Sequence, residues 1–162
     1  MKRNVFYLFI FIGFICFGSC KNAVTGKPEA TGGIQWLTID EGLTKGSTAG
    51  KKILVQIETD SCKWCDIMHD KTYSNETLAA FINENLIPIR FNTLFKDSLE
   101  FRGKKYGPKK IGRLDIHELA EEWMIYNYTY PTTIIMDPGF NQLVKFTGAK
   151  DPDQFLLELK KM

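Results

Sequence analysis

The feature that most constrains this chain is a short apolar run followed closely by two cysteines. Residues 53–57 (ILVQI) are mostly β-branched or aliphatic, which is typical of a strand buried on both faces. Cys62 and Cys65 follow, three positions apart. Trp64, Cys65 and Met68 recur at near-helical spacing, so we expect a helix from Cys62 to about Met68. The sequence therefore predicts two thiols at the start of a helix, where they can close into a disulfide and reopen.

The first twenty residues have the pattern of an export signal. Lys2 and Arg3 give a positive start, and residues 5–17 form an apolar run too short to span a bilayer comfortably. Small residues then precede Cys20, which resembles the lipobox of bacterial lipoproteins, where the cysteine becomes the lipidated first residue. A cleaved signal without a lipid and an uncleaved anchor are the alternatives. We expect residues 1–20 to direct export under all three interpretations.

Export changes what the four cysteines can do. Cys16 lies within the signal and Cys20 is the expected lipidation site, so only Cys62 and Cys65 remain in the folded part. A bridge between these two closes a very short loop, and such a bridge stabilises a fold less than a long-range one. The pair is therefore better explained by reactivity than by a structural role.

Composition indicates one globular domain. The chain has 162 residues, of which 44% are hydrophobic and 25% charged, so a packed core is expected. Residues 21–33 are polar and rich in Gly and Thr, which predicts a flexible tether before a domain at 34–162. Lys2 and Arg3 account for the whole formal net charge of +2. Nothing in this balance indicates nucleic acid as a partner.

The remaining periodicity predicts alternating strands and helices. Further strands are expected at residues 34–37, 86–92, 130–137 and 143–146. Helices are expected at residues 39–45, 77–84 and 115–123, the second with Ser74 as its N-cap and the third with Asp115. Asp151 and Pro152 are expected to begin a last helix. Residues 93–112 are interpreted as a basic, solvated insertion rather than a binding patch, with a hairpin at Gly103-Lys104. A strand–helix–strand start implies parallel pairing, and the end implies an antiparallel hairpin. This order predicts an α/β fold with a central mixed sheet of four to five strands flanked by helices.

This order, with Tyr130-Pro131 before a later strand, resembles the thioredoxin fold over residues 34–162. Residues 62–68 (CKWCDIM), 72–75 (TYSN) and 81–89 (FINENLIPI) are similar to exported thioredoxin-like lipoproteins of the Bacteroidetes kind and to the C-terminal thioredoxin domain of DsbD-type reductases. The resemblance implies that Pro131 is cis and stands against the cysteine pair.

Two departures from thioredoxin affect the chemistry. Lys63 and Trp64 replace the Gly-Pro between the cysteines. Gln56 replaces a buried aspartate that assists proton transfer at the second cysteine in the family. Because an amide does not titrate, we expect either Glu58 or water to take that part, or the exchange to be slower.

The residues predict a division of roles within the pair. Unpaired N–H groups and the positive dipole at a helix start favour a thiolate at Cys62, which we expect to be the nucleophile. Cys65, one turn on and more buried, is then the resolving thiol. Pro131 lacks an N–H, the Tyr130 backbone is positioned to pair with a client peptide, and Trp64 either gives the rim an apolar surface or packs on the domain. These three form the expected substrate-binding residues.

The expected function is an exported thiol–disulfide oxidoreductase that reduces or isomerises disulfides of extracytoplasmic proteins. Its partners are protein clients, a reductant or oxidant protein and, through a lipid anchor, the cell-envelope membrane. No cofactor beyond the Cys62–Cys65 disulfide is expected. No metal is expected either, because a site formed by Cys62, Cys65 and His69 would lack a fourth ligand. His117 is interpreted as a surface residue, and Glu58, Asp60 and Asp66 as solvated acids. The alternatives are a non-catalytic module that binds a metal or a protein, and a structural protein whose pair stays oxidised.

Overall fold

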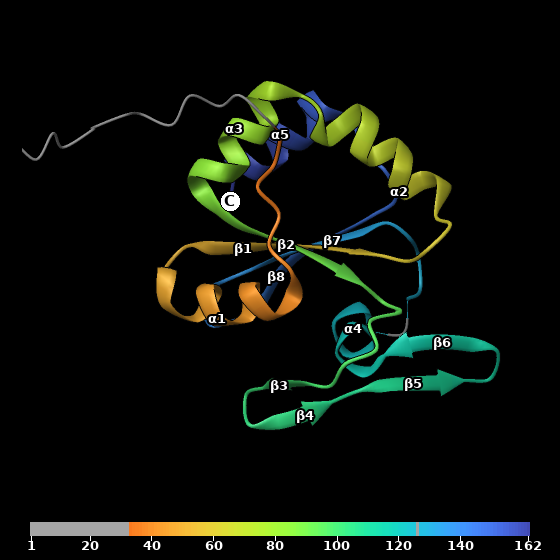
Figure 1. Ribbon diagram of the computed structural model, residues 1–162. Coiled ribbons are helices and arrows are strands. Elements are labelled where there is room, and N and C mark those ends of the chain that lie inside the picture. Colours follow the sequence, from red (N-terminus) through yellow and green to blue (C-terminus); the bar gives the residue numbers. More distant parts are fainter. Residues whose placement is uncertain (1–32, 126) are drawn as a thin grey trace, which may run out of the picture.

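A four-stranded sheet lies between two layers of helices in the computed structural model, which describes residues 33–125 and 127–162 (Figure 1). The predicted signal at 1–20, Cys20 and nearly all of the tether at 21–33 lie outside the described residues. The strands, in spatial order, are β2 (Leu86–Asn92), β1 (Lys52–Glu58), β7 (Thr132–Met136) and β8 (Gln142–Thr147). β1 runs parallel to β2 and antiparallel to β7, and β7 runs antiparallel to β8. This confirms the predicted mixed sheet.

Helices cover both faces of the sheet. On one face lie α2 (Lys63–Ile67), the π-helix η1 (Met68–Tyr73), α3 (Glu76–Asn85) and α5 (Pro152–Lys160), and on the other lie α1 (Ile39–Ala49) and α4 (Glu118–Met124) (Figure 1). Alternate residues of β1 serve the two layers, because Leu54 packs with the α3 and α5 core whereas Val55 packs with the opposite core. This explains why the first apolar run is continuous. No helix among the described residues is both long and apolar enough to cross a membrane.

Local capping decides where the helices begin. At the start of α5 the Asp151 carboxylate accepts hydrogen bonds from the amides of Asp153 and Gln154, and Pro152 takes the first helical position, as predicted. The cap of α3 is Asn75, whose side chain accepts from Leu78, so the expectation of Ser74 was wrong by one residue. The Ser74 hydroxyl instead donates to the Asp70 carbonyl at the end of η1, which removes it from the capping position.

The chain between Gly33 and α1 forms less strand than predicted. Of residues 34–37, only Leu37 pairs with the sheet, through an isolated parallel bridge to Ile89 of β2. Helix α1 then extends four residues past the predicted end at Lys45, because Thr38 and Glu41 form a capping box at its start and Gly50 closes it in the left-handed conformation.

The segment after β2 carries two hairpins rather than one. Strands β3 (Leu99–Phe101) and β4 (Lys104–Tyr106) form the predicted hairpin, and β5 (Pro108–Ile111) pairs with β6 (Leu114–His117) in a second one that the sequence did not suggest. The lysines of these two hairpins are exposed, but one face of the segment is not solvated. Its apolar side chains are buried in the core: Leu99, Phe101, Tyr106 and Ile116. The interpretation as a wholly solvated insertion was therefore wrong.

His117 is the cap of α4, so the expected cap at Asp115 and the expected surface position of His117 were both wrong. Asp115 lies within β6, and α4 begins three residues later. The His117 side chain is fully buried; its Nδ1 accepts from the Leu119 amide and its Nε2 donates to the Asp97 carbonyl, 3.2 Å away. The imidazole thus joins the start of α4 to the loop before β3.

This arrangement predicts a loss of stability in mild acid. Burial lowers the pKa of His117, against the opposing effects of the Asp97 carbonyl, Glu118 and Asp40. Below about pH 6.5 the unfolded chain therefore takes up a proton that the folded chain resists, so stability is complete above that pH and falls as the pH drops toward the folded pKa. Between about pH 7 and 5 the free energy of unfolding should fall with a slope of up to about 1.4 kcal/mol per pH unit.

The matched variant is His117→Asn, which keeps a capping acceptor but cannot charge in this range. Urea unfolding of both proteins across the interval measures the two slopes, and the variant should show the shallower one. Equal slopes would contradict the assignment. Glu58 is a buried carboxylic acid whose pKa lies below its ordinary value, so its protonation affects stability only at more acidic pH.

Candidate redox-active site

Cys62 and Cys65 form a disulfide where β1 passes into α2. The Sγ–Sγ distance is 2.14 Å and the Cα atoms are 5.2 Å apart. Ser61 takes a left-handed conformation with φ of 57°, which turns the chain from the strand into the helix. Cys62 is the N-cap, and its Sγ accepts from the Cys65 amide at 3.2 Å. The sulfur of Cys62 therefore lies where unpaired amides stabilise negative charge.

The two cysteines differ in exposure. Cys65 is 3% exposed, whereas Cys62 is partly open to solvent. Trp64, which lies between them, is 61% exposed and so does not pack on the domain; its role in an apolar rim stays a prediction. An incoming disulfide can therefore reach Cys62 but not Cys65.

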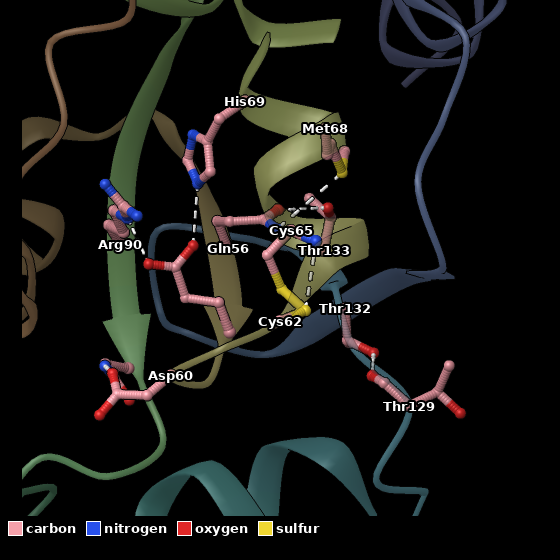
Figure 2. Close-up of a disulfide and its surroundings, with 12 residues drawn as sticks. Gln56, Asp60, Cys62, Cys65, Met68, His69, Arg90, Thr129, Thr132 and Thr133 are labelled. Atoms are coloured by element: carbon pink, nitrogen blue, oxygen red, sulfur yellow. Dashed lines mark hydrogen bonds and ion pairs between the residues drawn. A yellow bond between two sulfur atoms is a disulfide. The ribbon is translucent and has the colours of Figure 1, made fainter. Parts of the chain in front are cut away.

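The start of β7 lies in the surroundings of the disulfide (Figure 2). The Tyr130–Pro131 peptide bond is cis, the isomer that the resemblance implied. Thr132 follows, its hydroxyl donating to the Thr129 carbonyl at 2.7 Å, and Figure 2 shows both threonines near the disulfide. The Pro131 carbonyl accepts from the Gly148 amide, which ties this turn to the loop after β8. The Tyr130 ring is half-buried; burial raises the pKa of its hydroxyl, partly offset by Thr93.

Gln56 occupies the floor of the site and is fully buried. Its Oε1 accepts from the Tyr73 hydroxyl at 2.6 Å and from the Thr133 hydroxyl at 2.7 Å, while its Nε2 faces the Met68 sulfur at 3.9 Å (Figure 2). Both ends of the amide are thus occupied. Gln56 fixes the contact between β1, β7 and η1, but it offers no titrating group beneath the cysteines.

Glu58 is buried and paired, so the expectation of a solvated acid was wrong for this residue, although Asp60 and Asp66 are exposed. Its Oε2 lies 2.9 Å from His69 Nε2, and its Oε1 accepts from Arg90 Nε. Burial alone would raise the pKa of Glu58, but the hydrogen bonds from His69 and Arg90 outweigh it and hold that pKa below its ordinary value. A buried ion pair thus lies two residues along β1 from Gln56.

The sequence contained one signal for this pair. Gln56 and Glu58 are two residues apart on a strand, so they project to the same face. Gln56 lies opposite Arg90 in the register of β1 and β2, which places a cation beside Glu58.

His69 has no group of three or more metal-binding side chains around it, and no such group occurs elsewhere in the described residues.

Comparison with known proteins identifies the fold. A protein-family model named Thioredox_DsbH, described as "Protein of unknown function, DUF255", matches residues 27–95. A thioredoxin from Thermus thermophilus is 16% identical with a TM-score of 0.58, over 79% of this chain and 85% of its own. A DsbH oxidoreductase is 19% identical with a TM-score of 0.55, over 88% and 93%. No curated protein matches.

A third similar structure is a putative disulphide-isomerase from Bacteroides thetaiotaomicron, 15% identical with a TM-score of 0.53, covering 78% of this chain and 88% of its own. At these identities the likeness concerns the fold. The chain is a thioredoxin-fold protein, and within that class it carries a Cys-Lys-Trp-Cys pair closed as a disulfide.

Proposed function

We propose that this protein is an exported thiol–disulfide oxidoreductase that reduces or isomerises disulfides of extracytoplasmic proteins. The asymmetry of the Cys62–Cys65 disulfide supports this proposal most directly. Cys62 is partly exposed and its Sγ accepts a hydrogen bond from the Cys65 amide, whereas Cys65 is buried. Two structural neighbours are named for related chemistry, as an oxidoreductase and as a putative disulphide-isomerase.

The reduced pair acts in two steps. The Cys62 thiolate attacks a client disulfide, forms a mixed disulfide and releases the first client thiolate. Cys65 then loses its proton and attacks Cys62 Sγ, which closes the Cys62–Cys65 disulfide and releases the second client thiolate. The client gains two electrons, and the protein is restored by a reducing partner. No cofactor enters this cycle.

Client recognition is assigned to the rim around Cys62. Trp64 supplies exposed apolar surface, and Pro131 has no N–H to compete beside the sulfurs. An extended client segment pairs with the backbone at Tyr130 and places its own disulfide over Cys62. This binding mode recognises the client mainly through its backbone rather than its side chains, so it suits a range of clients.

The proposed location rests on the sequence of residues 1–20, which lie outside the described residues. Their charge and apolar run favour export, and Cys20 in a lipobox-like position favours a lipid anchor at the cell envelope. The domain then works where disulfides form and persist.

Catalysis of insulin-disulfide reduction tests the activity. Catalytic amounts of the protein should accelerate the precipitation of insulin in dithiothreitol several-fold over dithiothreitol alone, because a pre-activated Cys62 reacts faster than a free thiol. Folded protein that leaves the rate unchanged would refute the proposal.

A further inference from the structure

Backbone pairing at Tyr130 does not distinguish one client from another, but the segment after β2 offers a surface that can. Residues 93–117 carry seven basic and three acidic side chains, a net charge of +4, whereas residues 21–92 and 118–162 together carry −4. The two hairpins are therefore a positive region on a domain that is otherwise negative. A region of one sign attracts partners of the opposite sign.

A groove lies within this positive region, between the loop after β2 and the β5–β6 hairpin. Its cavity volume is about 210 Å³. Part of the lining is apolar and comes from the half-buried side chains of Leu94 and Phe95 and from the buried Ile116. The groove can therefore accept apolar atoms of a ligand as well as charged ones.

Lysines line the same groove, and two of them are available to a ligand. Lys96 forms no ion pair with any described residue. Lys110 lies 3.8 Å from Asp115, but both side chains are more than half exposed, and such a pair contributes little energy. Lys109, the third, is held by Glu121. Three ammonium groups against the single carboxylate of Asp115 leave the lining positive, which favours an anionic ligand.

Thr93 joins this groove to the redox site. Thr93 is one of the lining residues, and its amide donates to the Glu58 carbonyl at 2.8 Å, at the end of the strand that leads to Cys62. The Thr93 hydroxyl also acts on the Tyr130 hydroxyl, next to the cis Pro131. Figure 1 shows the β5–β6 hairpin on the side of the molecule where β1 and β2 end. A peptide bound at Cys62 can therefore continue into the groove.

We propose that this groove binds an acidic segment of the client protein whose disulfide is exchanged at Cys62; this inference rests on the proposed function. The client strand pairs with the backbone at Tyr130 and runs past Thr93. Its carboxylates then meet Lys96 and Lys110, and its apolar side chains contact the apolar lining. Contacts between charges of this kind raise the rate of encounter and select among partners more than they raise affinity. The exchange itself still passes through Cys62 and Cys65.

Two disulfide-linked peptides test the groove. They differ only in whether runs of Glu or runs of Gln flank the cysteine on both sides, and a fluorophore and a quencher on the two halves report cleavage. The reduced protein is mixed with each peptide in a stopped-flow instrument at low ionic strength. The Glu peptide should react about tenfold faster than the Gln peptide, and high salt should reduce the difference to about twofold or less, because salt screens exposed charges.

The groove variant combines Lys96→Gln with Lys110→Gln, two changes at exposed side chains. It should react with the Glu peptide no more than about twofold faster than with the Gln peptide, and its rate with the Gln peptide should stay at the wild-type value. The matched control combines Lys104→Gln with Lys105→Gln, which removes the same charge from the same segment but outside the groove. This control should keep the preference for the Glu peptide. Circular dichroism shows that both variants fold.

Equal rates for the two peptides with the wild type would overturn the inference. So would a preference that survives in the groove variant or falls as far in the control. Binding of the wild type to phosphatidylglycerol vesicles that the groove variant loses, with both peptides reacting alike, would assign these lysines to a lipid surface instead. A wild type that reduces neither peptide would refute the proposed function, whereas reduction of both at one rate would refute only the groove.

Discussion

Serine in place of Cys62 is expected to reduce insulin-disulfide reduction to the rate of dithiothreitol alone. The serine hydroxyl stays protonated at neutral pH and forms no bond to sulfur that a second thiol can exchange, so neither step of the cycle starts. The fall should therefore equal the whole acceleration given by the wild type. Insulin turbidity measures it, with circular dichroism to show that the variant folds.

Folding should survive the change, since the Cys62–Cys65 bridge spans a sequence separation of only three residues. Ser is also a good N-cap, so Cys62→Ser keeps an acceptor for the Cys65 amide. Ser61→Ala changes the adjacent exposed residue without touching a thiol and serves as the control. Retained reductase activity in Cys62→Ser would contradict the assignment of the nucleophile.

Serine in place of Cys65 should give the opposite phenotype, a protein that reacts once and stops. Cys62 remains at the start of the helix and attacks, but nothing displaces the client from it. With dithiobis(nitrobenzoate) the variant should release one nitrothiobenzoate per chain and keep the other as a stable adduct, whereas the wild type releases two. Intact-protein mass spectrometry measures the adduct.

The same variant reports on clients. Expressed where the wild type resides, Cys65→Ser should accumulate mixed disulfides that run as larger species on non-reducing gels and collapse on reduction. The control is the Cys62→Ser, Cys65→Ser double variant, which should trap nothing. Equal trapping by both proteins would show that the adducts do not pass through Cys62.

The sheet and the cysteine pair could be predicted because local pattern and burial agree there. Residues 53–57 are apolar on both faces, and the strand they form is indeed covered on both faces. Asp151 and Pro152 carry the start of α5 in two adjacent residues. In both places the local sequence is enough to predict the element, without knowledge of the rest of the chain.

The predictions for His117 and Glu58 were wrong because their positions depend on tertiary contacts. His117 acts as a cap only because the Asp97 carbonyl and the Leu119 amide converge on its ring. Glu58 is buried only because His69 and Arg90 arrive from η1 and β2 to pair with it. Acidic side chains are seldom buried unless they are paired, and sequence order alone does not show which cation will reach Glu58.

The reduction potential of the Cys62–Cys65 couple distinguishes a redox-active pair from a structural disulfide. The protein is equilibrated with dithiol and disulfide buffers, thiols are trapped by alkylation, and the reduced fraction is measured by mass spectrometry. We expect a reversible two-electron transition between the potentials of thioredoxin, about −270 mV, and DsbA, about −120 mV. A pair that remains oxidised in buffers below about −300 mV would behave as a structural disulfide and contradict a redox function.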